Sequence, residues 1–447
     1  MRALAEKIKP VKLIIKSDYN LPSLGIAVFT LYAITQRLLD LYSNIRVFDI
    51  TVVRVFELLL FSFSLLCLLF GRHDQQKFVK SFTGIDLFWF VATIYIIISM
   101  FYVNADRYDY FIYIAVFLFL FFAKTEINDF SKAFLFIKYG AVFYAAGTLV
   151  QFIIPEQFNN FILKLVPKYS LDLLASRVAA NYYPGFGFNQ LAIASNYISI
   201  GLGLTLAFWD KNHARIIKNS ILFIVLFTAL FITGNRSFFL WTIVALYMTY
   251  IASSSGNEWL RRAIKASAAV LGLAVIAFMI NYFFAEMHML ARLQLFLSEV
   301  IYRDVNGSLA IRLSLYQDAW SVFLNNPWFG IGWDQFMLIH DSGFRVHNII
   351  LQILAETGIV GFLLIMPAII YSYIITYKAM RYSIGRVGTT SSFWTKALSL
   401  SFYYQTVFLL SSLSDTIFYR PPFLLMYFLT LAIVNSYIYL QRNFEPA

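Results

Sequence analysis

The chain has 447 residues, of which 60% are hydrophobic and 13% charged, and its formal net charge at pH 7 is +11. A globular domain carries roughly 25% charged residues, so a soluble core cannot absorb this much apolar surface and a soluble protein is excluded. The single cysteine, Cys67, excludes a disulfide within the chain, and membrane topology explains the basic charge without a nucleic-acid partner.

Apolar runs long enough to cross a bilayer recur along the whole chain. Because a transmembrane helix needs about 20 mostly apolar residues, we expect an all-α polytopic membrane protein with about twelve transmembrane helices. They are predicted at residues 22–40, 50–70, 84–103, 108–123, 133–154, 189–209, 218–235, 237–254, 266–285, 348–375, 395–414 and 422–440. No internal repeat or linker interrupts the pattern, so residues 1–447 are expected to form a single transmembrane domain.

The distribution of lysine and arginine predicts the orientation of these helices. Cytoplasmic loops are enriched in both residues, so the N-terminal stretch, with cations at positions 2, 7, 9, 12 and 16, is placed in the cytoplasm. Every second loop agrees, through Arg72, Lys77, Lys80, Lys211, Arg215, Lys218, Arg261, Arg262, Lys265, Lys378, Arg381, Arg386 and Lys396. An even number of spans then puts both termini in the cytoplasm, with the first span as an uncleaved anchor.

Two predicted outer loops, residues 155–188 and 286–347, are much longer than the other connections. Loops of this length are usually functional. The larger one contains the segment Leu309–Phe323, whose apolar residues recur at helical spacing. We therefore expect a large extracytoplasmic loop with amphipathic helices on or near the outer leaflet.

The richest cluster of polar and turn residues runs from Asn326 to Gly361 as NPWFGIGWDQFMLIHDSGFRVHNIILQILAETGIVG. His347 and Asn348 stand where the outer loop enters the tenth span, and Glu356 follows about 13 Å further along a helix. An ionisable group inside a membrane is costly and is therefore a functional candidate. The structural alternative, in which Glu356 only hydrogen-bonds a neighbouring helix, is the more frequent case.

The position of His347 favours a catalytic role. It lies at a helix start on the predicted outer side, where the positive end of the helix dipole disfavours an imidazolium. A neutral imidazole is a competent general base. Taken alone, a histidine at this depth is more often an interfacial side chain held by lipid headgroups.

Two arginines lie on the same predicted outer face. Arg236 stands in the tight turn Thr233–Ser237, almost alone among outer cations, and Arg312 lies in the amphipathic segment of the large loop. The usual fate of such residues is snorkelling to lipid phosphate or exposure to solvent. Together with His347 they suit a reaction with an anionic leaving group and a hydroxyl that loses a proton, because arginine forks match phosphate oxygens.

Three motifs resemble the O-antigen ligase and polymerase superfamily. GIGWDQF, followed by His347–Leu351 and Ala355–Gly358, is similar to the family's central signature. Thr233–Ser237 resembles its Thr-x-x-Arg-Ser/Ala turn, and Arg312–Tyr316 resembles its loop motif Arg-Leu-x-x-Trp/Tyr. The motifs agree with the family in order, spacing and topology over a catalytic region at residues 230–365.

The resemblance implies an inverting glycosyltransferase that needs no metal and no cofactor. Its donor would be an undecaprenyl-pyrophosphate-linked glycan, and its acceptor a hydroxyl of a glycan or of lipid A-core. The protein would lie in the bacterial inner membrane with its active site on the periplasmic side. Arg236 and Arg312 would hold the pyrophosphate, and His347 would deprotonate the acceptor. The supporting candidates are Arg345, Asn348 and Glu356.

The sequence leaves the choice between a ligase and a polymerase open. Some polymerases of this type carry Arg-x10-Gly motifs in their outer loops, and neither Arg177 nor Arg312 is followed by a glycine at that spacing, which favours a ligase. The short gap between Gly332 and His347 favours a polymerase instead. Related protein-glycosylating transferases usually carry a soluble C-terminal region, which does not follow the last predicted span, so this activity is less expected.

A transporter of lipid-linked glycans or small solutes is the alternative from another class. Charged pairs within predicted spans, Arg37 with Asp40 and Arg54 with Glu57, suit a substrate path, although local ion pairing explains them equally well. A transporter does not need a long outer loop that ends at a histidine. The sequence decides neither the sugar, the linkage, the acceptor nor the oligomeric state.

Overall fold

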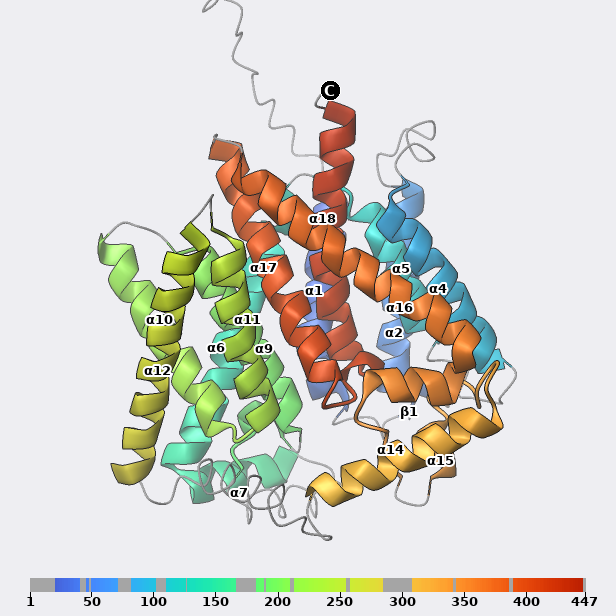
Figure 1. Cartoon of the computed structure of the whole chain (residues 1–447), viewed down its shortest axis with the longest axis horizontal. Coiled ribbons are helices and arrows are strands. Elements are labelled where there is room, and N and C mark those ends of the chain that lie inside the picture. Colours follow the sequence, from blue (N-terminus) through green and yellow to red (C-terminus); the bar gives the residue numbers. More distant parts are fainter. Residues whose placement is uncertain are drawn as a thin grey trace, which may run out of the picture.

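The computed structural model describes residues 21–40, 46–47, 50–70, 82–101, 110–125, 127–165, 182–188, 190–209, 213–254, 258–283, 308–340, 343–385 and 389–444. These residues fold almost entirely into helices (Figure 1). The longer helices are α1 (Leu21–Asp40), α2 (Val52–Phe70), α4 (Gly84–Phe101), α5 (Tyr110–Phe122), α6 (Ser131–Ile153), α7 (Pro155–Leu165), α9 (Leu191–Ala207), α10 (His213–Ile232), α11 (Arg236–Ala252), α12 (Trp259–Phe283), α14 (Ser308–Asn325), α16 (Ile349–Ile384), α17 (Thr389–Ser412) and α18 (Pro421–Phe444).

The remaining elements are short. They are the helix α15 (Phe336–Ile339) and the 3-10 helices η1 (Ile127–Phe130), η3 (Gly185–Gly187) and η5 (Ile417–Tyr419). Two-residue strands, β1 (Arg46–Val47) and β2 (Ile50–Thr51), pair antiparallel between α1 and α2. This small hairpin is the one departure, among the described residues, from the predicted all-α class.

Some sequence predictions fall outside the described residues. These are the N-terminal cations, Arg72, Lys77, Lys80, Arg177, Lys211, Arg386, residues 166–181 and 284–307 of the two outer loops, and the side chains of Arg37 and Asp40.

Each predicted span contains one of the long helices, so the class of helical polytopic membrane protein is confirmed. Six helical segments of the described chain are long and apolar enough to cross a bilayer, and four further apolar helices are shorter. Large apolar side chains such as Leu69 and Phe70 are 64% and 72% exposed. Lipid hydrocarbon is as apolar as leucine, so such a surface suits a helix that faces the bilayer.

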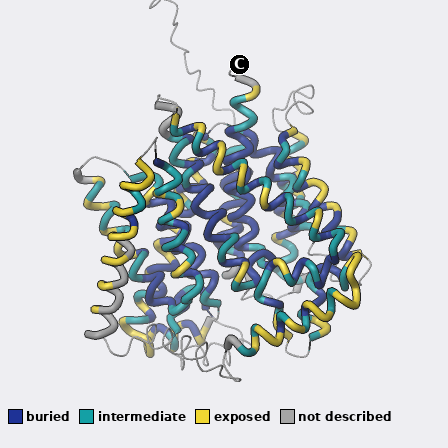
Figure 2. The backbone as a smooth tube through the Cα atoms, viewed as in Figure 1, coloured by how far each residue is buried: buried dark blue, intermediate teal, exposed yellow. Residues whose placement is uncertain are grey.

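Helix α18 lies in the middle of the bundle, where Figure 2 shows mostly buried backbone. It packs against α1, α5, α16 and α17. Between Phe423 and Val434 its side chains are buried throughout. The last helix of the chain is therefore the core around which the other helices are arranged.

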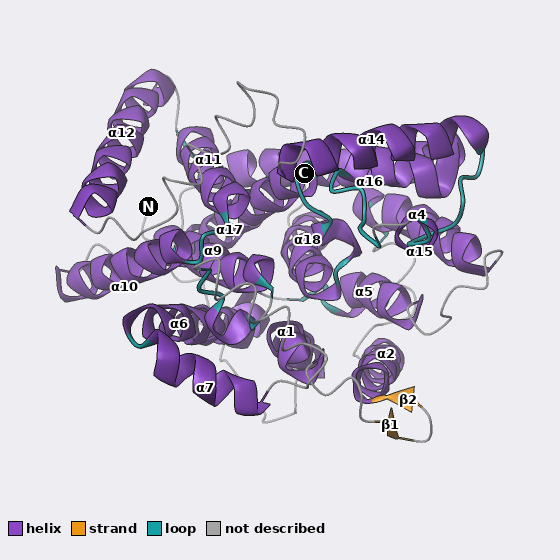
Figure 3. Cartoon of the chain, turned by 90° about the horizontal axis from the view of Figure 1, so that it is seen from below, coloured by secondary structure: helices purple, strands orange, loops and turns teal. Residues whose placement is uncertain are grey.

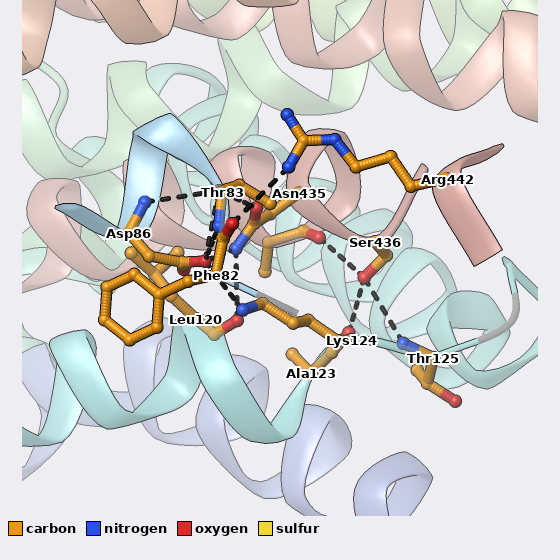
Figure 4. Close-up of polar contacts among 11 residues, drawn as sticks. Phe82, Thr83, Asp86, Leu120, Ala123, Lys124, Thr125, Asn435, Ser436 and Arg442 are labelled. Carbon is orange, nitrogen blue, oxygen red and sulfur yellow. Dashed lines mark hydrogen bonds and ion pairs between the residues drawn. The ribbon is translucent and has the colours of Figure 1, made fainter. Parts of the chain in front are cut away.

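A buried polar network ties the end of the bundle at which α18 ends (Figure 4). The Lys124 ammonium lies 2.6 Å from Oδ2 of Asp86, and the Asn435 amide donates to Oδ1 of Asp86 at 2.7 Å. The amide N–H of Thr83 also donates to Asp86, at 2.8 Å. The side chains of Lys124 and Asp86 are 1% and 0% exposed, so the ion pair depends on these neutral donors to offset its desolvation. The network joins α4, the end of α5 and α18.

Helix α16 is divided by Gly358, whose backbone has φ 63° and ψ −169°. Residues 349–357 form a first piece that runs beside α14, and residues 359–384 continue as a long helix across the bundle (Figures 1 and 3). The predicted span at 348–375 was expected to be one helix with Glu356 deep along it. That expectation is wrong, because the positive φ of Gly358 turns the chain directly after Glu356.

The loop at residues 327–332 satisfies the backbone groups that this break leaves without helical partners. On one side of the break the amide of Gly332 donates to the carbonyl of Glu356 at 2.7 Å. On the other side the amide of Ile359 donates to the carbonyl of Pro327 at 2.8 Å. Non-helical backbone at a membrane boundary is tolerated when protein groups pair with it in this way.

Glycine is required at both sides of this contact. Gly330 has φ 67°, and a Cβ atom added there would lie 2.3 Å from the carbonyl carbon of Glu356. A Cβ atom at Gly358 would lie 2.3 Å from the carbonyl of Trp328. The two backbones therefore approach too closely for any side chain, and both residues also adopt a left-handed conformation.

Helix α14 confirms the helix predicted at Leu309–Phe323. Its buried face, which includes Leu315 and Ala319, packs against Val346 and Ala355. Among residues 310–325 the exposed side chains carry no charge, and they include Leu313, Trp320 and Leu324. An uncharged, partly aromatic outer face suits the boundary between headgroups and hydrocarbon.

Candidate active site

The three residues predicted to act on substrate lie at the same end of the bundle. Arg236 begins α11, Arg312 lies on α14, and His347 stands just before α16. This is the end opposite to the C-terminus of α18 (Figure 1). Two contacts connect the elements: Trp241 of α11 donates to Ser414 Oγ at 3.0 Å, and Tyr316 of α14 donates to the carbonyl of His347 at 3.3 Å.

The backbone at His347 is left-handed, with φ 59°, which is uncommon for a residue with a side chain. Restraints on both sides hold this conformation. Its carbonyl accepts the Tyr316 hydroxyl, and the next side chain, Asn348, caps α16 by accepting the amides of Ile350 and Leu351 at 3.0 and 3.1 Å. Strained backbone that the surroundings fix in this way is typical of functional sites.

The imidazole of His347 faces the carboxylate of Asp415, whose side chain is 16% exposed. Its Nδ1 atom lies 3.4 Å from Oδ1 of Asp415, which stands in the connection between α17 and α18. In this geometry the pair does not form a hydrogen bond, and Nδ1 is buried without a hydrogen-bond partner among the described residues. Contacts of catalytic groups are often long in the absence of substrate, so a small movement of either side chain would close this one.

Asp415 is held in its ionised form. Burial by itself would raise the pKa of this carboxyl, but Arg420, His347 and the amide of Thr416 together hold the pKa well below its usual range. The Thr416 amide donates to Oδ1 at 2.7 Å, and the Arg420 guanidinium lies 3.8 Å from the same oxygen. A negative charge therefore stands beside the imidazole.

Sequence reasoning missed Asp415 and gave no role to Arg420. A signal was present, because Asp415 is the only acidic residue between α17 and α18. Its distance from His347 in sequence, however, hides the contact. Only the tertiary fold brings the two residues together, and beside them the Asn348 side-chain amide donates to the carbonyl of Leu413 at 3.4 Å.

Arg345, one of the supporting candidates, is engaged within the protein. Its Nε and Nη2 atoms donate to the two carboxylate oxygens of Asp334 at 2.7 and 2.6 Å. This bidentate fork fixes the chain two residues before His347. The side chain is 20% exposed, so Arg345 mainly braces the loop.

Glu356 also braces this loop. Its carboxylate accepts the amides of Asp334 and Phe336 at 2.9 and 3.2 Å and the side-chain amide of Gln352 at 3.0 Å. The residue is completely buried. These contacts match the structural alternative stated for Glu356, with a loop in place of a neighbouring helix as the partner.

The two predicted phosphate ligands are half-buried side chains. Arg236 is the first residue of α11, whose N-terminus is capped by the Asn235 side chain accepting the amide of Phe238 at 3.3 Å. Arg312 lies one helical turn before Tyr316, and burial raises the pKa of that phenol while Arg312 opposes the shift. A helix N-terminus with an arginine on it is a favourable place for an anion.

The fold and these residues define a polytopic helical membrane protein with a polar site at one end of its bundle. Residues 221–366 match the family model Wzy_C, which is described as O-antigen ligase. This segment is therefore similar to the O-antigen ligase family, which implies an enzyme of the type that transfers lipid-linked glycans. All six site residues predicted from the sequence lie inside the matched segment, whereas Asp415 and Arg420 lie outside it. A comparison of the sequence with curated proteins found no match.

Proposed function

We propose that the protein is an inverting, metal-independent glycosyltransferase that moves a glycan from undecaprenyl pyrophosphate to a hydroxyl acceptor. The observation that carries the proposal is the contact of His347 with the carboxylate of Asp415, at the end of the bundle that also holds Arg236 and Arg312. The O-antigen ligase domain supports the substrate class.

In this mechanism His347 is the general base. The carboxylate of Asp415 faces Nδ1, so Nδ1 carries the hydrogen of the neutral ring and Nε2 is left to accept a proton from the acceptor hydroxyl. Asp415 then stabilises the imidazolium that forms. A carboxylate orients and stabilises a catalytic histidine in the same way in many acyl-transfer enzymes.

Arg236 and Arg312 act on the donor. The acceptor oxygen bonds to the anomeric carbon from the face opposite the phosphate, the bond from that carbon to the phosphate oxygen breaks, and lipid pyrophosphate leaves. Negative charge grows on the leaving oxygen as the bond breaks. Two guanidinium groups placed against it stabilise the transition state more than the bound donor, and that difference accelerates the reaction.

The proposal includes the finer topology: twelve spans, both termini in the cytoplasm, and the site on the periplasmic side of the inner membrane. One observation and the expected direction of substrate access support it. The end of the bundle that carries His347 is opposite to the end at which the described basic residues Arg262 and Arg381 lie. An undecaprenyl-linked acceptor or a lipid A-core would also reach the site from the outer leaflet.

A polymerase remains the second candidate within the same family. It would use the same donor chemistry but would accept the hydroxyl of another lipid-linked repeat. The residues described above serve both reactions equally, since they act on the pyrophosphate and on a hydroxyl proton.

Transport is less favoured by the structure. Transporters bind substrates at broken helices whose unwound backbone is open to ligand. The break at Gly358 is instead closed by the loop 327–332. In the second span, Glu57 is buried and lies 3.5 Å from the Tyr32 hydroxyl of α1, which is an ordinary polar contact between helices.

Reconstitution of the purified protein with a lipid-linked glycan tests the proposal. We expect release of undecaprenyl pyrophosphate and a product of inverted anomeric configuration, with the same rate in the presence of a chelator. Transfer to lipid A-core identifies a ligase, and elongation of the lipid-linked glycan identifies a polymerase. Passage of intact donor across the bilayer with no new glycosidic bond would show that the protein is a transporter.

A further inference from the structure

Asp415 is shared between two positively charged or protonatable groups. The Nδ1 atom of His347 lies 3.4 Å from its Oδ1 atom, and the Nη2 atom of Arg420 lies 3.8 Å from the same oxygen. The amide of Thr416 donates to this oxygen as well, at 2.7 Å. Arg420 therefore competes with the imidazole for the charge of one carboxylate oxygen.

The position of Arg420 is fixed by its backbone. Its amide donates to the carbonyl of Ile417 in η5 at 3.1 Å, and its own carbonyl accepts the amides of Phe423 and Leu424 at 3.1 and 3.2 Å. Pro421 follows directly and begins α18. The guanidinium thus extends toward Asp415 from a rigid corner, with 26% of the side chain exposed.

The consequence for His347 follows from the permanent charge of arginine. An unshared carboxylate beside an imidazole favours the imidazolium and so raises the proton affinity of the ring. A guanidinium on the same oxygen offsets part of that attraction and also repels the imidazolium directly. A base must be neutral before it can take a proton, so this balance decides the lowest pH at which His347 works.

Other charged and titratable groups lie on the elements near His347. Tyr316 contacts the His347 carbonyl from α14, and Arg312 lies one turn before Tyr316. Arg345, two residues earlier, is paired with Asp334, and Arg236 begins the neighbouring helix α11. Among the ion pairs of the described residues, only that of Arg420 with Asp415 uses the carboxylate oxygen that faces Nδ1 of His347.

We infer that Arg420 is a positioning residue that acts through Asp415 to keep His347 neutral and thereby sets the acid limit of the reaction. The inference rests on the proposed function for its role in catalysis. The effect on the imidazole itself does not, because it concerns only the proton affinity of the ring.

The test is a titration of His347 in the full-length protein in nanodiscs. Diethyl pyrocarbonate modifies neutral imidazole, and the modified His347 peptide is followed by mass spectrometry across pH. Arg420→Gln and Arg420→Met should raise the midpoint of this modification, because the charge that offsets the carboxylate is lost. Arg420→Lys should stay near the parent, and Asp415→Asn should lower the midpoint.

The same variants are then assayed for glycan transfer. In Arg420→Gln the pH at which kcat falls on the acid side should rise by the same amount as the midpoint of His347 modification. At pH values well above that midpoint, transfer should stay within a few fold of the parent. Equal midpoints in the parent, Gln and Met proteins would overturn the inference. If the pH midpoint of His347 modification shifts but neither the parent nor any variant transfers glycan, the inference about Arg420 holds and the proposed function fails.

Discussion

The Nδ1 atom of His347 and the Oδ1 atom of Asp415 lie 3.4 Å apart, although His347 stands just before α16 and Asp415 follows α17. The contact depends on the broken helix α16. Because Gly358 turns the chain, the first piece of α16 runs beside α14 and places His347 against the connection between α17 and α18. Gly358 and the loop at residues 327–332 thus position the first piece of α16, and His347 supplies the reactive side chain.

The arginine pair gives the first prediction. Arg236→Lys and Arg312→Lys keep the charge but lose the planar fork that matches phosphate oxygens. Each should lower glycan transfer by about tenfold to a hundredfold, in the range seen when a transition-state donor is weakened. Transfer is measured on purified protein, and accumulation in the membrane is the control for folding. Full activity of both variants would remove the arginines from the mechanism.

The orientation of the bundle can be tested with single cysteines, since the native Cys67 is buried and shielded from an aqueous reagent. Asn326→Cys is exposed at the His347 end, and Gly385→Cys is exposed at the other end, after α16. An impermeant thiol reagent should label Asn326→Cys in cells whose outer membrane alone is permeabilised, and Gly385→Cys only after lysis. The reverse pattern would show that the site faces the cytoplasm.

The break in α16 predicts a loss of stability when its glycines gain a side chain. Gly358→Ala combines a left-handed backbone, which costs about 1–3 kcal/mol, with a clash against the carbonyl of Trp328. Thermal unfolding in detergent should therefore occur at a clearly lower temperature. Gly272→Ala in α12 is the matched control, because nothing lies within 4 Å of the added Cβ atom. Equal melting temperatures for the two variants would contradict the described contact.

The buried pair at the opposite end gives a prediction that is independent of activity. Lys124→Met leaves the Asp86 carboxylate buried without its cation, which typically costs 3–5 kcal/mol. The exposed Lys378→Met in α16 should have little effect on the unfolding temperature. The double variant Lys124→Met, Asp86→Leu should recover part of the loss, and a double variant less stable than the single one would contradict this account.

Hydropathy predicted the helices well because a bilayer constrains each span locally. Every predicted span contains a helix, and the helix predicted at Leu309–Phe323 is α14. The same local reasoning failed at Gly358, since nothing in the hydropathy of residues 348–375 distinguishes a continuous helix from a broken one. The break depends on hydrogen bonds with a separate loop, residues 327–332, which lies outside the span whose hydropathy was considered.

The site could be predicted only in part, for a related reason. Motif residues such as His347 and Arg236 are recognisable one by one, whereas Asp415 acts through a contact between distant helices. His340 illustrates the same limit. From its sequence it is a loop residue outside the three motifs, but its Nε2 atom lies 2.9 Å from Oδ2 of Asp318, and the ring stacks on Phe336. A substitution of His340 would disturb α14, so His340→Ala is unsuitable as a control for His347→Ala.

The most direct measurement is the rate of glycan transfer by His347→Ala across pH, with Gln317→Ala on the exposed face of α14 as the control. A general base contributes typically 10²–10⁴-fold, so His347→Ala should lose at least about a hundredfold in rate while donor binding changes little. The parent should lose activity as pH falls, because the imidazolium cannot accept a proton. Asp415 does not cause that loss, since its pKa lies well below its usual range and it stays ionised. Parent-like transfer by His347→Ala, with an unchanged pH profile, would contradict the assignment of the base.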